Sequence, residues 1–115
     1  MNDDFSDEEL DLFDLYTPLR IVDELPASYG VGLRYLIEWE ELPVGGISVE
    51  SGNGLGRESK RLLEEWEVRK AEIAGGKRDA FDQEGWRKAM KVWNAKSRAE
   101  QTRVIQAFKA QRSRV

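Results

Sequence analysis

The sequence predicts a mainly α-helical, single-domain protein of about four helices with an acidic N-terminal arm. The chain has 115 residues, a length that suits one domain. Apolar residues recur at intervals of three and four through its second half, which is typical of amphipathic helices. Serines three residues before a glutamate, and a pair of adjacent glycines, mark where these helices are expected to begin and end.

The acidic arm is expected to cover residues 1–17, and the helical domain residues 18–115. Ser6-Asp7-Glu8-Glu9 has the pattern of a capping box and predicts a short helix over about residues 7–16. This helix should end before Pro18, because the residue that precedes a proline is disfavoured in helical conformation. Residues 17–32 contain two prolines and two glycines and predict a turn-rich connection.

Residues 33–42 fit either a helix or a strand. Every second residue from Leu33 to Trp39 is apolar, as in a strand. On a helix the segment groups Arg34, Glu38 and Glu41 on one side, with Glu40 alone within the apolar arc. Its leucines and glutamates favour helix, so we predict a helix. The alternative is an α+β fold in which a hairpin spans residues 31–51 and turns through Val44-Gly45-Gly46-Ile47.

Three helices are predicted after a glycine-rich loop over residues 43–56. The first covers residues 57–74 and ends at Gly75-Gly76, and its buried stripe is Leu62, Leu63, Trp66 and Ile73. The second covers residues 82–95, with Trp86, Met90 and Trp93 on one face. Ser97-Arg98-Ala99-Glu100 is a second capping-box pattern, which predicts a break and a new helix over 98–112 with an apolar edge at Val104 and Phe108. One continuous helix is the alternative.

The composition argues against an enzyme. The chain has no cysteine and no histidine, which excludes disulfides, thiolate nucleophiles, Cys/His zinc sites and Ser-His-Asp triads. The glycines before Arg57 do not have the spacing of a P-loop or of a dinucleotide-binding motif. Carboxylates are numerous, but they fall on polar helix faces. We therefore predict no catalytic residue, no metal and no cofactor.

Charge is distributed very unevenly along the chain. Residues 1–24 carry nine acidic side chains and one basic one, and residues 85–115 carry nine basic side chains and one acidic one. Such asymmetry concerns partners and self-association rather than fold. The two ends can pair within one molecule or both be solvated, the acidic end can meet a basic surface, and the basic end can meet nucleic acid or an acidic protein.

The acidic arm carries the most specific motif, Glu9-Leu10-Asp11-Leu12-Phe13. It resembles the bacterial sliding-clamp-binding pentapeptide, whose pattern is Gln-Leu-Ser/Asp-Leu-Phe, and differs from it at Glu9. The resemblance implies that Leu10, Leu12 and Phe13 enter an apolar pocket of a partner, with Asp11 at a polar position. Asp7 and Glu8 extend the same predicted contact. More broadly, apolar anchors in an acidic segment suit groove-binding interactions. The alternative is that these residues dock the arm onto the domain's own core.

The leading functional hypothesis is a small accessory protein that binds another protein. Such short, charge-polarised chains resemble phage-encoded inhibitors of host machinery, so a host or virion protein is the expected partner. One alternative is an assembly component of a phage particle that self-associates through its oppositely charged ends. The other is nucleic-acid binding through residues 85–115, either by phosphate contacts and tryptophan stacking or by a helix-turn-helix.

The basic C-terminal end is the second predicted contact surface. The residues expected to form it are Arg87, Lys88, Lys91, Lys96, Arg98 and Arg103. The N-terminal residues are acidic and no long apolar segment occurs, so no signal peptide and no membrane span are expected. We therefore expect a cytoplasmic protein, in the host cytoplasm or the virion if it is phage-encoded.

Overall fold

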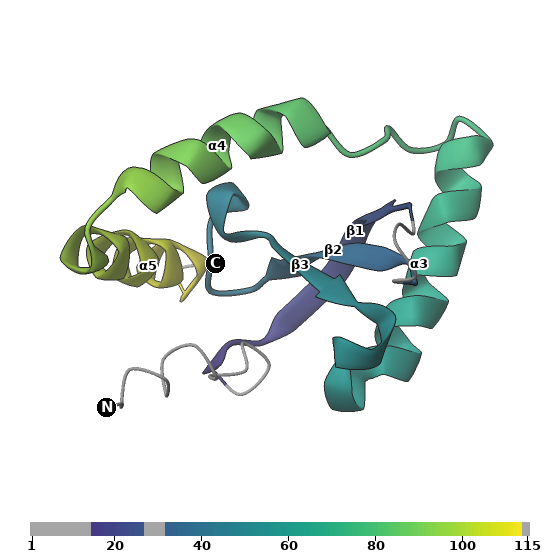
Figure 1. Cartoon of the computed structure of the whole chain (residues 1–115), viewed down its shortest axis with the longest axis horizontal. Coiled ribbons are helices and arrows are strands. Elements are labelled where there is room, and N and C mark those ends of the chain that lie inside the picture. Colours follow the sequence, from purple (N-terminus) through teal and green to yellow (C-terminus); the bar gives the residue numbers. More distant parts are fainter. Residues whose placement is uncertain (1–14, 27–31, 114–115) are drawn as a thin grey trace.

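The computed structural model describes residues 15–26 and 32–113, and it has an α+β fold. A three-stranded antiparallel sheet is followed by three helices (Figure 1). The prediction of a mainly α-helical class is therefore wrong. The helix predicted over residues 7–16 falls almost wholly within residues 1–14, which are outside the described residues.

The sheet is built from β1 (Pro18–Leu25), β2 (Arg34–Trp39) and β3 (Ser48–Ser51), with β2 in the centre. β1 pairs with β2 antiparallel from Pro18 opposite Trp39 to Leu25 opposite Arg34, with two register shifts. β2 pairs with β3 from Arg34 opposite Ser51 to Ile37 opposite Ser48. An ion pair of 3.0 Å between Arg20 Nη1 and Glu38 Oε1 also links β1 to β2.

Two sequence-based predictions are corrected by this sheet. Residues 17–32, predicted as a connection, contain β1, and residues 33–42, predicted as a helix, contain β2. The reason for the second error is that the neighbours Leu36 and Ile37 are both fully buried, on opposite faces of the sheet. A strand covered on both faces loses the strict alternation of apolar and polar residues that identifies strands in a sequence.

The connection from β2 to β3 differs from the tight turn of the predicted hairpin. β2 and β3 do pair antiparallel within residues 31–51, but residues 40–47 separate them and include the 3₁₀ helix η1 (Val44–Gly46). Two further 3₁₀ turns follow β3, η2 (Gly52–Gly54) and η3 (Gly56–Glu58). The loop predicted over residues 43–56 therefore contains a short strand and 3₁₀ turns.

The three predicted C-terminal helices are confirmed. They are α3 (Ser59–Ala74), α4 (Gln83–Ala95) and α5 (Arg98–Ser113). α3 ends as predicted at the glycine pair, where the Gly75 N–H donates to Ala71 O at 2.9 Å and Gly76 has a φ of +76°. The break between α4 and α5 is also confirmed, so the continuous helix is wrong.

α3 and α4 cover the two faces of the sheet (Figure 1). On one face Ile21, Ile37 and Trp39 pack in a buried cluster with Leu62 and Trp66 of α3. A second buried cluster joins Leu36 to Ile47 and to Trp86 of α4. The Trp86 indole N–H also donates to Ile47 O at 3.2 Å, which satisfies its polar atom inside this cluster.

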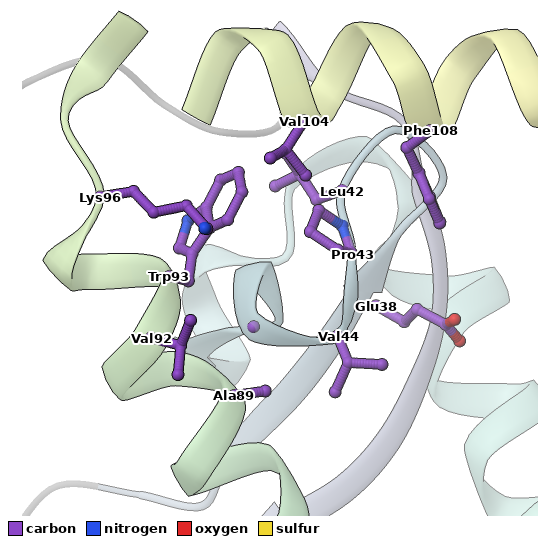
Figure 2. A pocket seen from close by; sticks show the side chains of 11 residues that line it. Glu38, Leu42, Pro43, Val44, Ala89, Val92, Trp93, Lys96, Val104 and Phe108 are labelled. Carbon is purple, nitrogen blue, oxygen red and sulfur yellow. The ribbon is translucent and has the colours of Figure 1, made fainter. Parts of the chain in front are cut away.

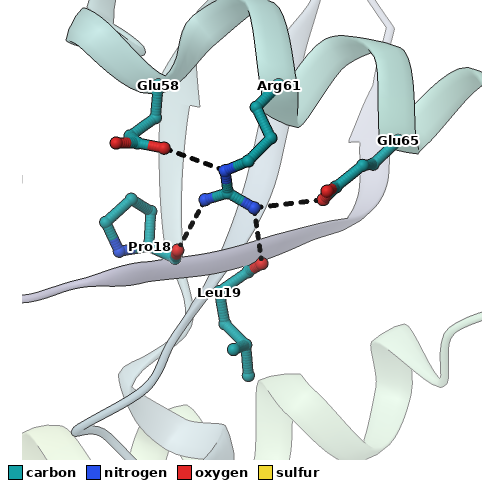
Figure 3. A network of polar contacts seen from close by, with 5 residues as sticks. All are labelled: Pro18, Leu19, Glu58, Arg61 and Glu65. Carbon is teal, nitrogen blue, oxygen red and sulfur yellow. Dashed lines mark hydrogen bonds and ion pairs between the residues drawn. The ribbon is translucent and has the colours of Figure 1, made fainter.

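Arg61 fastens α3 to β1 by polar contacts (Figure 3). Its guanidinium donates to Pro18 O at 3.0 Å and Leu19 O at 3.4 Å on the strand. It also donates to Glu58, the residue before α3, at 2.8 Å and to Glu65 of α3 at 3.1 Å, which lie three residues before it and four residues after it. The planar guanidinium can satisfy both the helix carboxylates and the strand carbonyls from one position.

Candidate functional site

The candidate site is a cavity between η1, α4 and α5, which we call the α4–α5 groove (Figure 2). Its volume is about 680 Å³, within the range of roughly 300–1,000 Å³ typical of ligand pockets. Glu38 and Lys96 are the charged side chains in its lining. The lining residues are Glu38, Leu42, Pro43, Val44, Gly45, Ala89, Val92, Trp93, Lys96, Val104 and Phe108.

α5 contributes half-buried apolar side chains to the groove. From Arg98 to Gln111 no α5 side chain is buried, although Val104, Ile105 and Phe108 are half-buried. Ile105 packs against the larger core cluster, while Val104 and Phe108 line the groove. An amphipathic helix normally buries its apolar stripe, and here part of the α5 stripe lines a cavity instead.

η1 and α4 form the opposite side and meet at a glycine. A Cβ added at Gly45 would lie 2.6 Å from Ala89 O and 2.8 Å from Trp93 Cβ, so only glycine allows the η1 backbone to approach α4 this closely. Beside this contact, Val44 and Val92 are 54% and 60% exposed. They are large apolar side chains left open to solvent at the mouth of the groove.

The junction between α4 and α5 is fixed by a capping box, as predicted. The Ser97 N–H donates to Glu100 Oε1 at 2.8 Å, and the Glu100 N–H donates to Ser97 Oγ at 3.1 Å. The hydrogen bonds from the Ser97 backbone and side chain lower the pKa of Glu100 below its usual value. Gln101 Nε2 also donates to Trp93 O at 2.8 Å, which ties the first turn of α5 to the end of α4.

Basic residues lie in the groove lining or close to lining residues in the sequence. Lys96 lies in its lining on the same side as Trp93 (Figure 2). Arg103 precedes Val104 and Lys109 follows Phe108, so each is about 100° around α5 from a groove-lining residue. Lys88 stands four residues before Val92 and therefore shares its face of α4. The groove thus combines an apolar lining with a predominantly basic surround.

The structure describes the predicted basic residues but not the predicted acidic contact. Arg87, Lys88 and Lys91 lie exposed on α4, Lys96 lies between the helices, and Arg98 and Arg103 lie exposed on α5. The predicted acidic contact is outside the described residues; it comprises Asp7, Glu8, Glu9, Leu10, Asp11, Leu12 and Phe13.

The predicted stacking role of the tryptophans is not supported. Trp86 is buried with only 5% of its surface exposed, and its indole N–H is hydrogen-bonded inside the core. Trp93 is half-buried in the groove lining. An aromatic platform for nucleic-acid bases needs an exposed ring face, which Trp86 does not offer.

Sequence reasoning missed the part of the groove that comes from the loop after β2. Leu42, Pro43 and Val44 were interpreted as helix end or loop, yet they form one side of the cavity. Their only sequence signal was a cluster of apolar residues next to Gly45-Gly46, which indicates a close backbone approach as readily as a flexible turn.

A second, smaller cavity of about 140 Å³ lies at the other end of the molecule's core. Its lining includes Val22, Arg69, Arg78 and Phe81. Arg69 Nε is buried and has no hydrogen-bond partner among the described residues. Burial, followed by the nearby charge of Arg78, lowers the pKa of Arg69. Arg78 itself forms an ion pair with Glu72 at 2.9 Å.

No family model matches the chain, and no curated protein or solved structure matches it either. Within the described part of the chain, no group of acidic side chains is arranged to hold a metal ion. The helices among those residues are also too short or too polar to cross a membrane.

Proposed function

We propose that this chain is a non-enzymatic accessory protein that binds a partner protein in the α4–α5 groove. The observation that carries the proposal is an apolar cavity of about 680 Å³ whose walls include exposed Val44 and Val92 and half-buried Val104 of α5. Contiguous exposed apolar surface of this kind marks interaction sites on small proteins.

The chemistry of the groove defines the partner. Its apolar lining suits leucine-sized or aromatic side chains, and the basic residues around it favour acidic flanks on the bound segment. Two or three apolar anchors on one face of an acidic peptide would meet both requirements, as in helix-in-groove recognition. A host or virion protein carrying such a segment, in the cytoplasm expected for a cysteine-free chain, is the partner class that we propose.

The acidic arm is the second contact of the proposed function. Its apolar residues and acids suit a basic, groove-containing surface on the partner. Self-assembly through the charged ends and nucleic-acid binding through residues 85–115 are weaker candidates. Both use the basic helical end but leave the apolar groove without a role.

A peptide-display selection tests the proposal. The full chain is immobilised and offered a library of random 16-residue peptides, and the enriched peptides are sequenced. We expect apolar residues spaced three or four apart together with several acids. The substitution Val104→Glu places a charge in the lining and should abolish the enrichment. Val68→Glu is the matched control, because Val68 is exposed on α3 and does not line the groove.

The outcome that contradicts the proposal is equally specific. Peptides that bind the Val104→Glu variant as well as they bind the unsubstituted chain would show that the groove is not the binding surface. Enrichment lost in both variants would show that α3 contributes to binding.

A further inference from the structure

We propose that the chain's own residues 10–13 occupy the α4–α5 groove, so that the acidic arm competes with the partner for one site. The inference rests on the proposed function of the groove and names its internal ligand. Leu10, Leu12 and Phe13 have the apolar character that the lining accepts, and Glu9, Asp11 and Asp14 supply the acidic flanks. Residues 1–14 are outside the described residues, but the point at which they join the described chain is fixed.

The arm joins the described chain beside the groove. The Thr17 N–H donates to Glu41 Oε1 at 2.8 Å, its hydroxyl donates to Glu41 Oε2 at 2.9 Å, and Thr17 O accepts from the Glu40 N–H at 2.9 Å. Glu41 is followed directly by Leu42, which lines the groove. These three hydrogen bonds therefore hold the start of the arm next to one wall of the cavity.

The distance from this point to the apolar anchors is short. Four residue steps separate Thr17 from Phe13, and an extended chain covers at most about 14 Å in four steps. Phe13 and Leu12 therefore come within reach of the groove without any rearrangement of the sheet. Leu15 lies within this stretch and is 51% exposed.

Charge favours the same placement. Residues 3–14 contain seven acidic side chains and no basic one. Lys96 and Glu38 line the groove, and Lys88 and Arg103 lie close in the sequence to groove-lining residues on α4 and α5. At ordinary ionic strength charges interact over about 8–10 Å, so this attraction acts only if the arm lies close to α4 and α5. A seated arm gains both apolar burial and charge pairing.

The consequence for the partner is a lowered apparent affinity. A short tether gives the arm an effective concentration of about 1 mM. If the arm's intrinsic dissociation constant were about 0.1 mM, roughly one groove in ten would be open, and the partner would bind about tenfold more weakly. Only a partner segment that binds the groove more tightly than the arm would then displace the arm.

A paramagnetic label tests the placement directly. Ser6→Cys creates a single thiol, because the chain has no cysteine, and a nitroxide on it broadens the amide signals of nearby residues in ¹⁵N-labelled full chain. We expect broadening at Val44, Val92, Val104 and Phe108. The matched control carries the label at Lys77→Cys, in the loop between α3 and α4, and should leave these signals unchanged.

Two further samples decide between sources of the broadening. Leu12→Ser/Phe13→Ser in the labelled chain should remove it, whereas Val68→Ser should not. In a mixed sample, one chain carries ¹⁵N but no nitroxide, and the other carries the nitroxide but no ¹⁵N. This sample should show no broadening. Broadening in the mixture would assign the groove to a second copy and overturn the inference. The inference would also be overturned if broadening were absent from the single-chain sample or persisted in the Leu12→Ser/Phe13→Ser variant.

The inference and the proposed function fail in different ways. A display-selected peptide should bind Leu12→Ser/Phe13→Ser about tenfold more tightly than the unsubstituted chain. An unchanged affinity would show that the arm does not occupy the groove and would leave the groove as a partner site. A display selection that enriches no peptide on either protein would overturn the proposed function.

Discussion

α3 and α5 are both sixteen residues long, yet they serve the fold in opposite ways. α3 buries Leu62 and Trp66 completely or nearly so and is fastened to β1 through Arg61. α5 buries no side chain between Arg98 and Gln111, and two residues of its apolar stripe, Val104 and Phe108, line a cavity. The difference shows that an apolar helix stripe alone does not reveal whether a helix builds the core or lines a binding surface.

The largest expected effect is a difference in stability between a core variant of α3 and a groove variant of α5. Leu62→Ala should lower the free energy of unfolding by about 3 kcal/mol, because Leu62 is fully buried and its removal leaves a cavity. Val104→Ala should lower it by less than about 1 kcal/mol, because Val104 is half-buried beside an existing cavity. Urea denaturation followed by circular dichroism measures both. Equal losses would show that α5 is as much a part of the core as α3.

An intermediate effect is expected where η1 touches α4. Gly45→Ala places a Cβ against Ala89 O and Trp93 Cβ, so η1 and α4 must separate, at a cost of about 2 kcal/mol. Gly52→Ala is the control, because its Cβ would make only an ordinary 3.7 Å contact with Tyr35. Thermal unfolding of the two variants measures the difference. Similar melting temperatures would mean that the close approach at Gly45 is not required.

The smallest effect concerns the pH dependence of the α3 attachment. The Trp66 indole N–H donates to Glu24 Oε1 at 2.8 Å and Lys70 Nζ lies 3.3 Å from the same oxygen, and these hydrogen bonds lower the pKa of Glu24. A carboxylate with a lowered folded-state pKa stabilises the fold above its unfolded pKa of about 4.3. It loses that contribution as the pH falls through the folded value.

Glu24→Gln should therefore destabilise the protein at pH 7 by about 1 kcal/mol, and the difference from the unsubstituted chain should shrink as the pH falls below 4. Denaturation at a series of pH values provides the measurement, with exposed Glu64→Gln as the control. A difference that stays constant down to pH 2 would rule out the charged carboxylate as the stabilising form.

The helices of the second half could be predicted because their signals are local. The Ser97–Glu100 capping box, the Gly75-Gly76 stop and the spacing of Leu62 and Trp66 depend only on residues within a few positions of each other. The structure has each of these features where the sequence indicates it.

The sheet could not be predicted because its determinants are distant in sequence. β1 begins at Pro18 and was interpreted as a connection, and its pairing depends on partners in β2 from Arg34 to Trp39. β3 is four residues of mixed polarity without a strand signal of its own. For β2, burial of both Leu36 and Ile37 follows from helices on both faces, which no local pattern reports.

The groove was predicted only in part for the same reason. Val104 and Phe108 were identified as an apolar edge of α5, and Lys96 as part of a basic surface. Their juxtaposition with Val44 depends on the contact between Gly45 and α4, which joins segments more than forty residues apart. Sequence spacing carries no information on such a contact without the fold.

The central claim is that the surface made by η1, α4 and α5 binds protein segments while α3 and the sheet hold the fold. Titration of the ¹⁵N-labelled full chain with the most enriched display peptide tests it most directly. We expect amide shifts at Val44, Val92, Lys96 and Phe108 that saturate together, with α3 from Lys60 to Ile73 unchanged. Shifts centred on α3, or no saturable shifts around the groove, would contradict the account.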